Sequence, residues 1–245
     1  MISALERQRY QRQIGIKEVG EEGQERLKAA KVLVAGAGGL GSASLPYLVA
    51  AGFGAIRIID QDLVELSNLN RQILHWTEDI GRPKTASAMD KLGRLNPEVD
   101  MESFQEKITN KNADALVGDC DLIVDALDNL STRYILNRVA IEKGIPFFHG
   151  AVSGFEGRAM TIIPGRTACL HCFYRGRLKG KKTPVIGVTP AIIGIIQATE
   201  VIKYVLGTGK LLTNTLMVYD GLSATFNKFK INRDPNCKAC GHLPS

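Results

Sequence analysis

The chain has 245 residues, of which 44% are hydrophobic and 23% are charged, values typical of a soluble globular protein rather than of a disordered chain. The net charge is only +6 at pH 7 and no run of five or more like charges occurs, so a basic tail that binds nucleic acid is not expected. Residues 1–13 are charged and polar, which predicts no signal peptide and a cytoplasmic location.

The first half of the chain alternates short apolar runs with longer amphipathic segments, which predicts strands and helices in turn. Residues 3–30 are predicted to form two short polar helices, separated at 18–23. The predicted strands that follow are 31–35, 55–60, 99–105 and 121–127, and the predicted helices are 39–52, 82–97, 113–119 and 131–144. Ser131 is the expected N-cap of the last helix, and Gly144 ends it.

The second half has a different pattern, with pairs of strands on either side of one long apolar helix. Strands are predicted at 145–152, 158–165, 214–221 and 224–234, with a basic loop at 173–188. Thr189 and Pro190 open the apolar helix, which polar residues interrupt, so it is predicted to be buried rather than to cross a membrane. The order of elements predicts an α/β fold, with an open and mostly parallel sheet and added antiparallel strands at the C-terminus.

A glycine-rich turn follows the first predicted strand. Gly36, Gly38 and Gly41 satisfy G-x-G-x-x-G, with Gly39 in the same turn, and Asp60 ends the next strand. In a Rossmann-like fold this pattern binds phosphate at a helix N-terminus and a ribose hydroxyl at the acid. The pattern predicts a bound nucleotide, but it does not distinguish a nicotinamide dinucleotide from ATP.

Charged and polar side chains beyond this turn favour ATP. The segment after the second strand contains Asp62, Asn68, Arg71 and Gln72, and Lys84 stands at the start of the next helix. An enzyme that cleaves a triphosphate needs cations near the phosphates, because negative charge builds there in the transition state. Arg71 and Lys84 supply such cations, although either alone is also compatible with a solvated surface charge.

Two carboxylates follow the buried strand 121–127. Asp125 and Asp128 stand at the carboxyl edge of the predicted sheet, where ligands bind in such folds. A carboxylate at this edge can hold Mg²⁺ that bridges phosphates. The alternative for Asp128 is that it caps the following helix.

Four of the five cysteines form two C-x-x-C pairs, Cys169 with Cys172 and Cys237 with Cys240. Four thiolates are the usual ligands of a tetrahedral structural Zn²⁺, and this site would tie the C-terminus to the segment before the long helix. A redox pair is the alternative, but a redox C-x-x-C occurs once, at a helix start. Cys120 is predicted to be a packed core thiol.

Short motifs along the chain resemble those of the ThiF/MoeB/HesA family, the bacterial and archaeal relatives of ubiquitin-activating enzymes. In chain order they are RYQRQ, GAGGLGS, DQDLVELSNLNRQ, GRPK, DALDN, HGAVSGFEGR, CLHC, QATEVIKYVLG and YDG. The resemblance implies that ATP and Mg²⁺ are used to adenylate the C-terminal carboxylate of a ubiquitin-like sulfur carrier that ends in Gly-Gly, of the MoaD or ThiS kind. The pathway implied is molybdopterin or thiamine synthesis.

The resemblance also assigns roles to residues. It implies Asp60 on the ribose, Asn68, Arg71 and Lys84 around the phosphates, and Asp128 as magnesium ligand and catalytic acid. It further implies a homodimer in which Arg12 reaches into the partner subunit's site. Only the resemblance points to Arg12, which would otherwise be a surface charge on an N-terminal helix.

The domain organisation follows from the absence of linkers and repeats, which predicts one adenylation domain over residues 1–245. It would comprise N-terminal helices at 1–30, a Rossmann-like nucleotide-binding part at 31–165, and a part at 166–245 with the zinc-tied crossover loop, the long helix and the last strands.

One departure from the family leaves the acceptor open. Many members carry a further cysteine in the loop before the long helix, and the loop 173–188 has none. We therefore expect adenylation but no covalent transfer through this loop. Adenylation of a small-molecule carboxylate or of a modified tRNA is the alternative, and a dehydrogenase or a non-catalytic nucleotide-binding scaffold fits the charged residues least.

Overall fold

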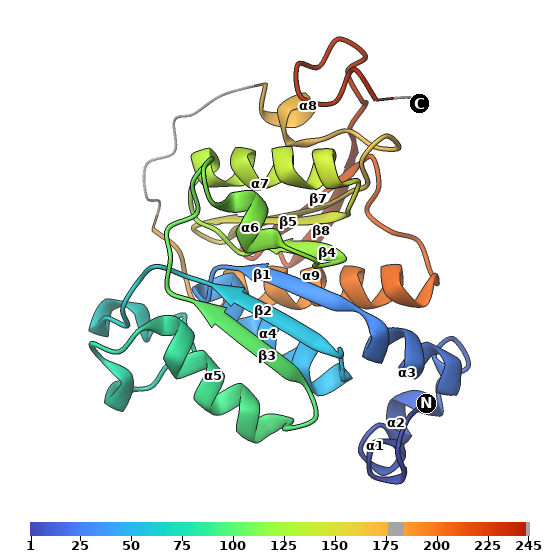
Figure 1. Cartoon of the computed structure of the whole chain (residues 1–245). Helices are drawn as coiled ribbons and strands as arrows, with labels where there is room; N and C mark the ends of the chain where they lie inside the picture. Colours follow the sequence, from blue (N-terminus) through green and yellow to red (C-terminus); the bar gives the residue numbers. More distant parts are fainter. Residues whose placement is uncertain (176–183, 244–245) are drawn as a thin grey trace.

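The computed structural model describes residues 1–175 and 184–243, in which eight strands form one sheet in the order β3-β2-β1-β4-β5-β6-β7-β8 (Figure 1). The five strands from β3 to β5 in this order are parallel, and β6, β7 and β8 are each antiparallel to the strand before. The bounds are β1 Lys31–Ala35, β2 Ala55–Ile59, β3 Asp100–Phe104, β4 Leu122–Asp125, β5 Phe147–Ser153, β6 Glu156–Ile162, β7 Thr215–Asp220 and β8 Thr225–Lys230. The expected mostly parallel sheet with antiparallel C-terminal strands is confirmed.

Helices cover both faces of this sheet (Figure 1). The helices among the described residues are α1 Ala4–Arg9, α2 Gln11–Ile14, α3 Gly20–Ala29, α4 Gly39–Ala51, α5 Lys84–Leu95, α6 Ala113–Val117, α7 Leu130–Lys143, α8 Leu170–Tyr174 and α9 Val188–Leu206. Val32 and Val34 of β1 pack in one apolar core with α4 and α9, whereas Leu33 and Ala35 pack in a second core with α6 and α7. Burial on both faces explains why β1 is an unbroken apolar run.

Three local predictions differ from the structure. The N-terminal region contains three helices, α1, α2 and α3, instead of two. Helix α7 is capped by Asn129, not by Ser131, because the Asn129 amide oxygen accepts a hydrogen bond from the backbone amide of Thr132 at 2.9 Å. Helix α9 begins at Val188, one residue before the expected Thr189. The basic part of the preceding loop, 176–183, lies outside the described residues.

Helix α9 is long and apolar enough to cross a membrane by length and composition alone. It packs instead against α4 and against strands β5 and β6, and Ile193, Ala198 and Val201 are buried in the first core. The buried Gln197 on the same helix donates hydrogen bonds of 2.8 Å to the carbonyl oxygens of Asp125 and Phe148. These contacts agree with the predicted buried helix.

Candidate functional site

A cavity of about 860 Å³ opens beyond the carboxyl ends of the parallel strands β1, β2, β3 and β4. Ligands of open α/β sheets bind at this edge, and the volume lies in the range of small-molecule sites. The lining comes from segments far apart in sequence: the glycine turn, 59–62, 70–72, Lys84, 106–108, 126–129, 131–133, Val152, Pro184, Val185 and Pro190. The fold thus gathers most of the predicted site residues around one space.

The glycine turn lies where β1 meets α4, and two of its positions require glycine. Gly36 has a φ of +106°, and a Cβ there would lie 2.6 Å from the carbonyl oxygen of Ala126. A Cβ on Gly41 would lie 2.0 Å from the carbonyl oxygen of Gly36. Helix α4 begins at Gly39 without a side-chain cap, so its first amide groups remain available to phosphate oxygens.

Asp60 holds the backbone of this turn. Its two carboxylate oxygens accept hydrogen bonds from the backbone amides of Ala37 at 2.8 Å and Asp62 at 2.9 Å. Burial raises the pKa of Asp60, and the nearby Lys84 ammonium opposes that rise. Asp60 lines the cavity, and its remaining lone pairs can accept a hydrogen bond from a ribose hydroxyl.

The two predicted cations both line the cavity but are held differently. Lys84 is only 5% exposed, and its Nζ lies 2.9 Å from Asp62 Oδ2, so it is not a solvated surface charge. The Arg71 guanidinium donates to the Ser67 carbonyl oxygen at 2.8 Å and to Asn70 Oδ1 at 2.9 Å. Both cations therefore stand beside the space where phosphates would lie, with Arg71 turned toward its own loop.

Two amide side chains of the predicted set behave differently. Gln72 lines the cavity and is 4% exposed, and its Oε1 has no hydrogen-bond partner among the described residues. A buried acceptor without a partner is costly unless a ligand satisfies it. Asn68 is buried but does not line the cavity; its Oδ1 accepts from the backbone amide of Glu65 at 3.2 Å.

Asp128 follows β4 and lines the cavity with an exposed side chain. Because Asn129 caps α7, the alternative that Asp128 caps this helix does not hold. Among the described residues Asp128 forms no ion pair, and its Oδ1 accepts one hydrogen bond, from the side-chain amide of Asn129 at 3.4 Å. An exposed carboxylate with free lone pairs fits the hard oxygen ligands that Mg²⁺ prefers.

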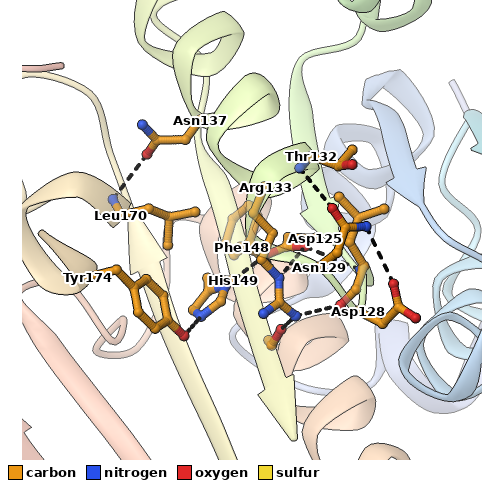
Figure 2. A network of polar contacts seen from close by, with 12 residues as sticks. Asp125, Asp128, Asn129, Thr132, Arg133, Asn137, Phe148, His149, Leu170 and Tyr174 are labelled. Atoms are coloured by element: carbon orange, nitrogen blue, oxygen red, sulfur yellow. Dashed lines mark hydrogen bonds and ion pairs between the residues drawn. The ribbon is translucent and has the colours of Figure 1, made fainter. Parts of the chain in front are cut away.

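Asp125, three residues earlier, is placed quite differently (Figure 2). It is fully buried at the end of β4. Its Oδ2 lies 3.1 Å from Arg133 Nε and 2.6 Å from His149 Nδ1. Burial lowers the pKa of His149, which favours the neutral form of its ring. A carboxylate held in this way is a structural group rather than a metal ligand.

Arg133 is one cavity residue that sequence reasoning missed. It is 6% exposed on α7 and lines the cavity. A usable signal was present, because an arginine on a helix face that is otherwise buried, as with Leu136 and Val139, requires an acidic partner. Glu106 and Lys107, after β3, also line the cavity, and nothing in their local pattern distinguishes them from solvated charges.

Arg12 does not line this cavity. It lies on α2, and Figure 1 shows the N-terminal helices beyond the amino ends of β1, β2 and β3, on the side opposite the arrowheads. Its predicted place in the site of a partner subunit stays a prediction.

The four paired cysteines form a cluster in which the sulfur atoms all lie within 4.8 Å of one another. The Sγ separations are 3.8 Å for Cys169–Cys172, 3.7 Å for Cys169–Cys237 and 3.5 Å for Cys172–Cys240. A tetrahedral zinc with bonds of about 2.3 Å requires sulfur separations of about 3.8 Å. The donor set and its spacing therefore fit a four-coordinate metal.

Cys120 lies apart from this cluster. It is buried in the second core, and burial raises the pKa of its thiol to about 11. A thiol that stays protonated at neutral pH is a packing group, as predicted.

Comparison with known proteins agrees with this geometry. Residues 10–239 match the ThiF family. The chain is 42% identical to the sulfur carrier protein adenylyltransferase of Thermus thermophilus, over 97% of this chain and 92% of that protein. It is 40% identical to the SAMP-activating enzyme E1 of Haloferax volcanii, over 98% of this chain and 91% of that protein.

Solved structures share the fold. The structure of E. coli MccB with ATP has a TM-score of 0.84 at 23% identity and covers 96% of this chain and 75% of that chain. The structure of PaaA has a TM-score of 0.82 at 28% identity, covering 94% of this chain and 75% of that chain. With a family match over residues 10–239 and relatives aligned along nearly its whole length, the chain belongs to the ThiF family.

Proposed function

We propose that this protein is an ATP-dependent adenylyltransferase whose substrate is the C-terminal carboxylate of a ubiquitin-like sulfur-carrier protein. The observation that carries the proposal is the cavity in which the glycine turn, the buried Lys84 and the exposed carboxylate of Asp128 line one space. The names of the Thermus and Haloferax relatives, a sulfur carrier protein adenylyltransferase and a SAMP-activating enzyme, support it.

Adenylation of a carboxylate requires cations beside the phosphates. A carboxylate is a poor acyl donor because its oxygen is a poor leaving group. Attack of a carboxylate oxygen on the α-phosphorus of ATP forms an acyl adenylate, breaks the bond to the β-phosphate and releases pyrophosphate. Two anions must meet in this step, so fixed cations have to offset their repulsion.

The groups that line the cavity have separate roles in this reaction. The amide groups at the start of α4 bind phosphate oxygens, and Asp60 accepts a hydrogen bond from the ribose. Lys84 exchanges its contact with Asp62 for the phosphates, and Arg71 turns from Ser67 toward them. Gln72 Oε1 accepts a hydrogen bond from the bound substrate. Asp128 would hold Mg²⁺, which would supply positive charge beside the phosphates.

Two further assignments belong to the proposal. The four-cysteine cluster holds a structural Zn²⁺, because its sulfur spacing suits a tetrahedral ion. The protein acts as a homodimer, in which Arg12 of one copy enters the cavity of the other. A dimer would give a role to an arginine that has no place in its own chain's cavity. We expect the enzyme to work in the cytoplasm.

The test is ATP–pyrophosphate exchange with separate acceptors. A carrier of the molybdopterin or thiamine pathway that ends in Gly-Gly should support exchange, whereas the same carrier without its last two residues should not. If free carboxylic acids or a tRNA support exchange and no carrier does, the fold adenylates another acceptor. Binding of a nicotinamide dinucleotide more tightly than ATP would contradict the proposal altogether.

A further inference from the structure

A chain of hydrogen bonds, buried at Asp125 and His149 and half-buried at Tyr174, runs from helix α8 to the backbone before Asp128, and the adenylation chemistry does not use it (Figure 2). It starts on α8, which follows Cys169, contains Cys172 and ends at Tyr174. The Tyr174 hydroxyl lies 3.1 Å from His149 Nε2, and the two rings meet edge to face at 5.7 Å between centroids. The last residue of the cysteine-bearing helix thus contacts the middle strands of the sheet.

The next link joins His149 to Asp125. His149 Nδ1 lies 2.6 Å from Asp125 Oδ2, so this nitrogen carries the proton and donates to the carboxylate. Nε2 is then an acceptor, and the Tyr174 hydroxyl donates to it. In these two hydrogen bonds each atom is either the donor or the acceptor, so the relative positions of Tyr174, His149 and Asp125 are well defined.

The last link fixes the backbone beside Asp128. Asp125 Oδ1 accepts a hydrogen bond from the Leu127 amide at 3.2 Å, and Arg133 Nη2 donates to the Leu127 carbonyl oxygen. Arg133 also donates to the carbonyl oxygen of Gly150 at 2.6 Å, which ties the same group to β5. Both backbone polar groups of Leu127 are therefore held, one residue before Asp128.

The position of Tyr174, at the other end of this row of hydrogen bonds, depends on the cysteines. Helix α8 has five residues, too few for a helix to persist without tertiary contacts. Its Leu170 amide donates to Asn137 Oδ1 at 3.1 Å, and Cys169 before the helix and Cys172 within it meet Cys237 and Cys240 from the C-terminal segment. If the four sulfurs are not joined by a metal, Tyr174 loses the anchor that keeps its hydroxyl at His149.

We propose that Tyr174 and His149 are positioning residues that couple the cysteine cluster to the loop that carries Asp128. The proposal rests on the proposed function for the role of Asp128, but the coupling itself is a property of the fold. Metal binding at the cluster then orders a loop in the cavity through Tyr174, His149, Asp125 and Arg133.

Hydrogen exchange tests the coupling without any activity measurement. Amide exchange in residues 126–130 is followed in the wild type and in Tyr174→Phe, each with zinc bound and after chelation. In the wild type, chelation should speed exchange in this segment about tenfold, the size expected when local opening becomes easier by one hydrogen bond. In Tyr174→Phe the segment should already exchange fast, and chelation should add little.

Kinetics provide the second readout. Tyr174→Phe should lower kcat for pyrophosphate exchange about tenfold and change KM for ATP less than about twofold, because a misplaced Asp128 weakens the transition state more than ground-state binding. Tyr204→Phe is the matched control, since the Tyr204 hydroxyl has no hydrogen bond among the described residues and its ring packs on Phe148 instead. Equal loss of activity in the two variants would contradict a positioning role for Tyr174.

The two proposals fail in different ways. If no acceptor supports exchange in the wild type but the hydrogen-exchange cycle behaves as described, the coupling holds and the proposed function does not. If chelation speeds exchange at 126–130 equally in the wild type and in Tyr174→Phe, or in neither, the coupling is overturned whatever the enzyme's activity.

Discussion

The cavity and the cysteine cluster differ in how their polar groups are satisfied. In the cavity, Asp128 is exposed without an ion pair among the described residues, and Gln72 Oε1 is buried without a partner. In the cluster, four sulfurs from two segments meet within 4.8 Å of one another. An open set of unsatisfied groups suits a ligand that arrives and leaves, whereas a closed set of donors suits a permanent tie.

The largest expected effect comes from removing the exposed carboxylate of the cavity. Asp128→Ala should lower pyrophosphate exchange at least about 10³-fold, because the proposed Mg²⁺ would lose its carboxylate ligand in the transition state. The melting temperature should stay close to that of the wild type, since the side chain makes no ion pair within residues 1–175 and 184–243. Asp114→Ala, which removes an exposed carboxylate on α6 that is paired with Arg138 and does not line the cavity, is the control. Exchange that survives in Asp128→Ala would remove the contrast between the two regions.

For the cysteine cluster we expect a large effect on stability and a small effect on nucleotide binding. Cys240→Ser, or chelation of the wild type, should lower the melting temperature by about 10 °C, as expected if metal binding contributes to folding. Nucleotide binding, measured by calorimetry below the new melting temperature, should change much less than stability. Cys120→Ser is the control, because this thiol lies outside the cluster. An unchanged melting temperature after complete removal of metal would show that the cluster is not a structural site.

A third experiment tests whether the role of a polar group depends on its hydrogen-bond and ion-pair partners rather than on its place in the fold. Asp79 belongs to the same long loop as Arg71 and Gln72 but is buried, and it is paired with Lys91 and Arg82. Burial alone would raise the pKa of Asp79, but hydrogen bonds from Lys91 and from the Trp76 amide lower it to about 2. Like the cluster, and unlike Asp128, this carboxylate should contribute to stability and not directly to exchange.

The change Asp79→Asn should therefore cost about 2 kcal/mol of unfolding free energy at pH 7. Because the pKa in the folded state is lowered, this stabilisation is fully present above about pH 4 and is lost as the pH falls through about 2. Urea unfolding of the two proteins at several pH values should show their difference shrinking below pH 4. Asp90→Asn, at an exposed carboxylate beside Arg82, should change stability little at any pH. A difference that is independent of pH would rule out the ion pair as its source.

The smallest expected effect is at Gln72. Because its Oε1 has no partner among the described residues, Gln72→Leu should leave stability unchanged or slightly raised. If the acceptor serves the ligand, KM for ATP should rise about fivefold, the size of one hydrogen bond. A loss of stability without a change in KM would instead make Gln72 a structural residue of the loop.

Local patterns in the chain were sufficient to predict the sheet, the glycine turn and the two cysteine pairs. The run Val32 to Ala35 is apolar because both faces of β1 are covered, and Gly36 and Gly41 stand where a Cβ would meet backbone oxygen. The cysteine pairs were readable because a four-thiolate site has a characteristic spacing within each pair. These features depend on neighbours within a few positions, so the sequence records them directly.

Other features depend on contacts between distant segments, and the sequence alone did not separate them. Asp125 and Asp128 are near neighbours in one motif, yet one is buried with Arg133 and His149 and the other is exposed in the cavity. Asn129 rather than Ser131 caps α7, because the turn after β4 brings its amide oxygen to the helix amides.

The amino-acid sequence by itself determined the order of strands and helices, the glycine turn and the sets of paired cysteines and cationic side chains. Only the tertiary structure decided which carboxylate is free, which amide is unsatisfied, and that Tyr174 on α8 reaches His149 on β5. The physical reason is that burial and pairing of a polar group are set by every segment packed around it, and those segments can be distant in sequence, as are Gln197 and Asp125, which lie 72 positions apart.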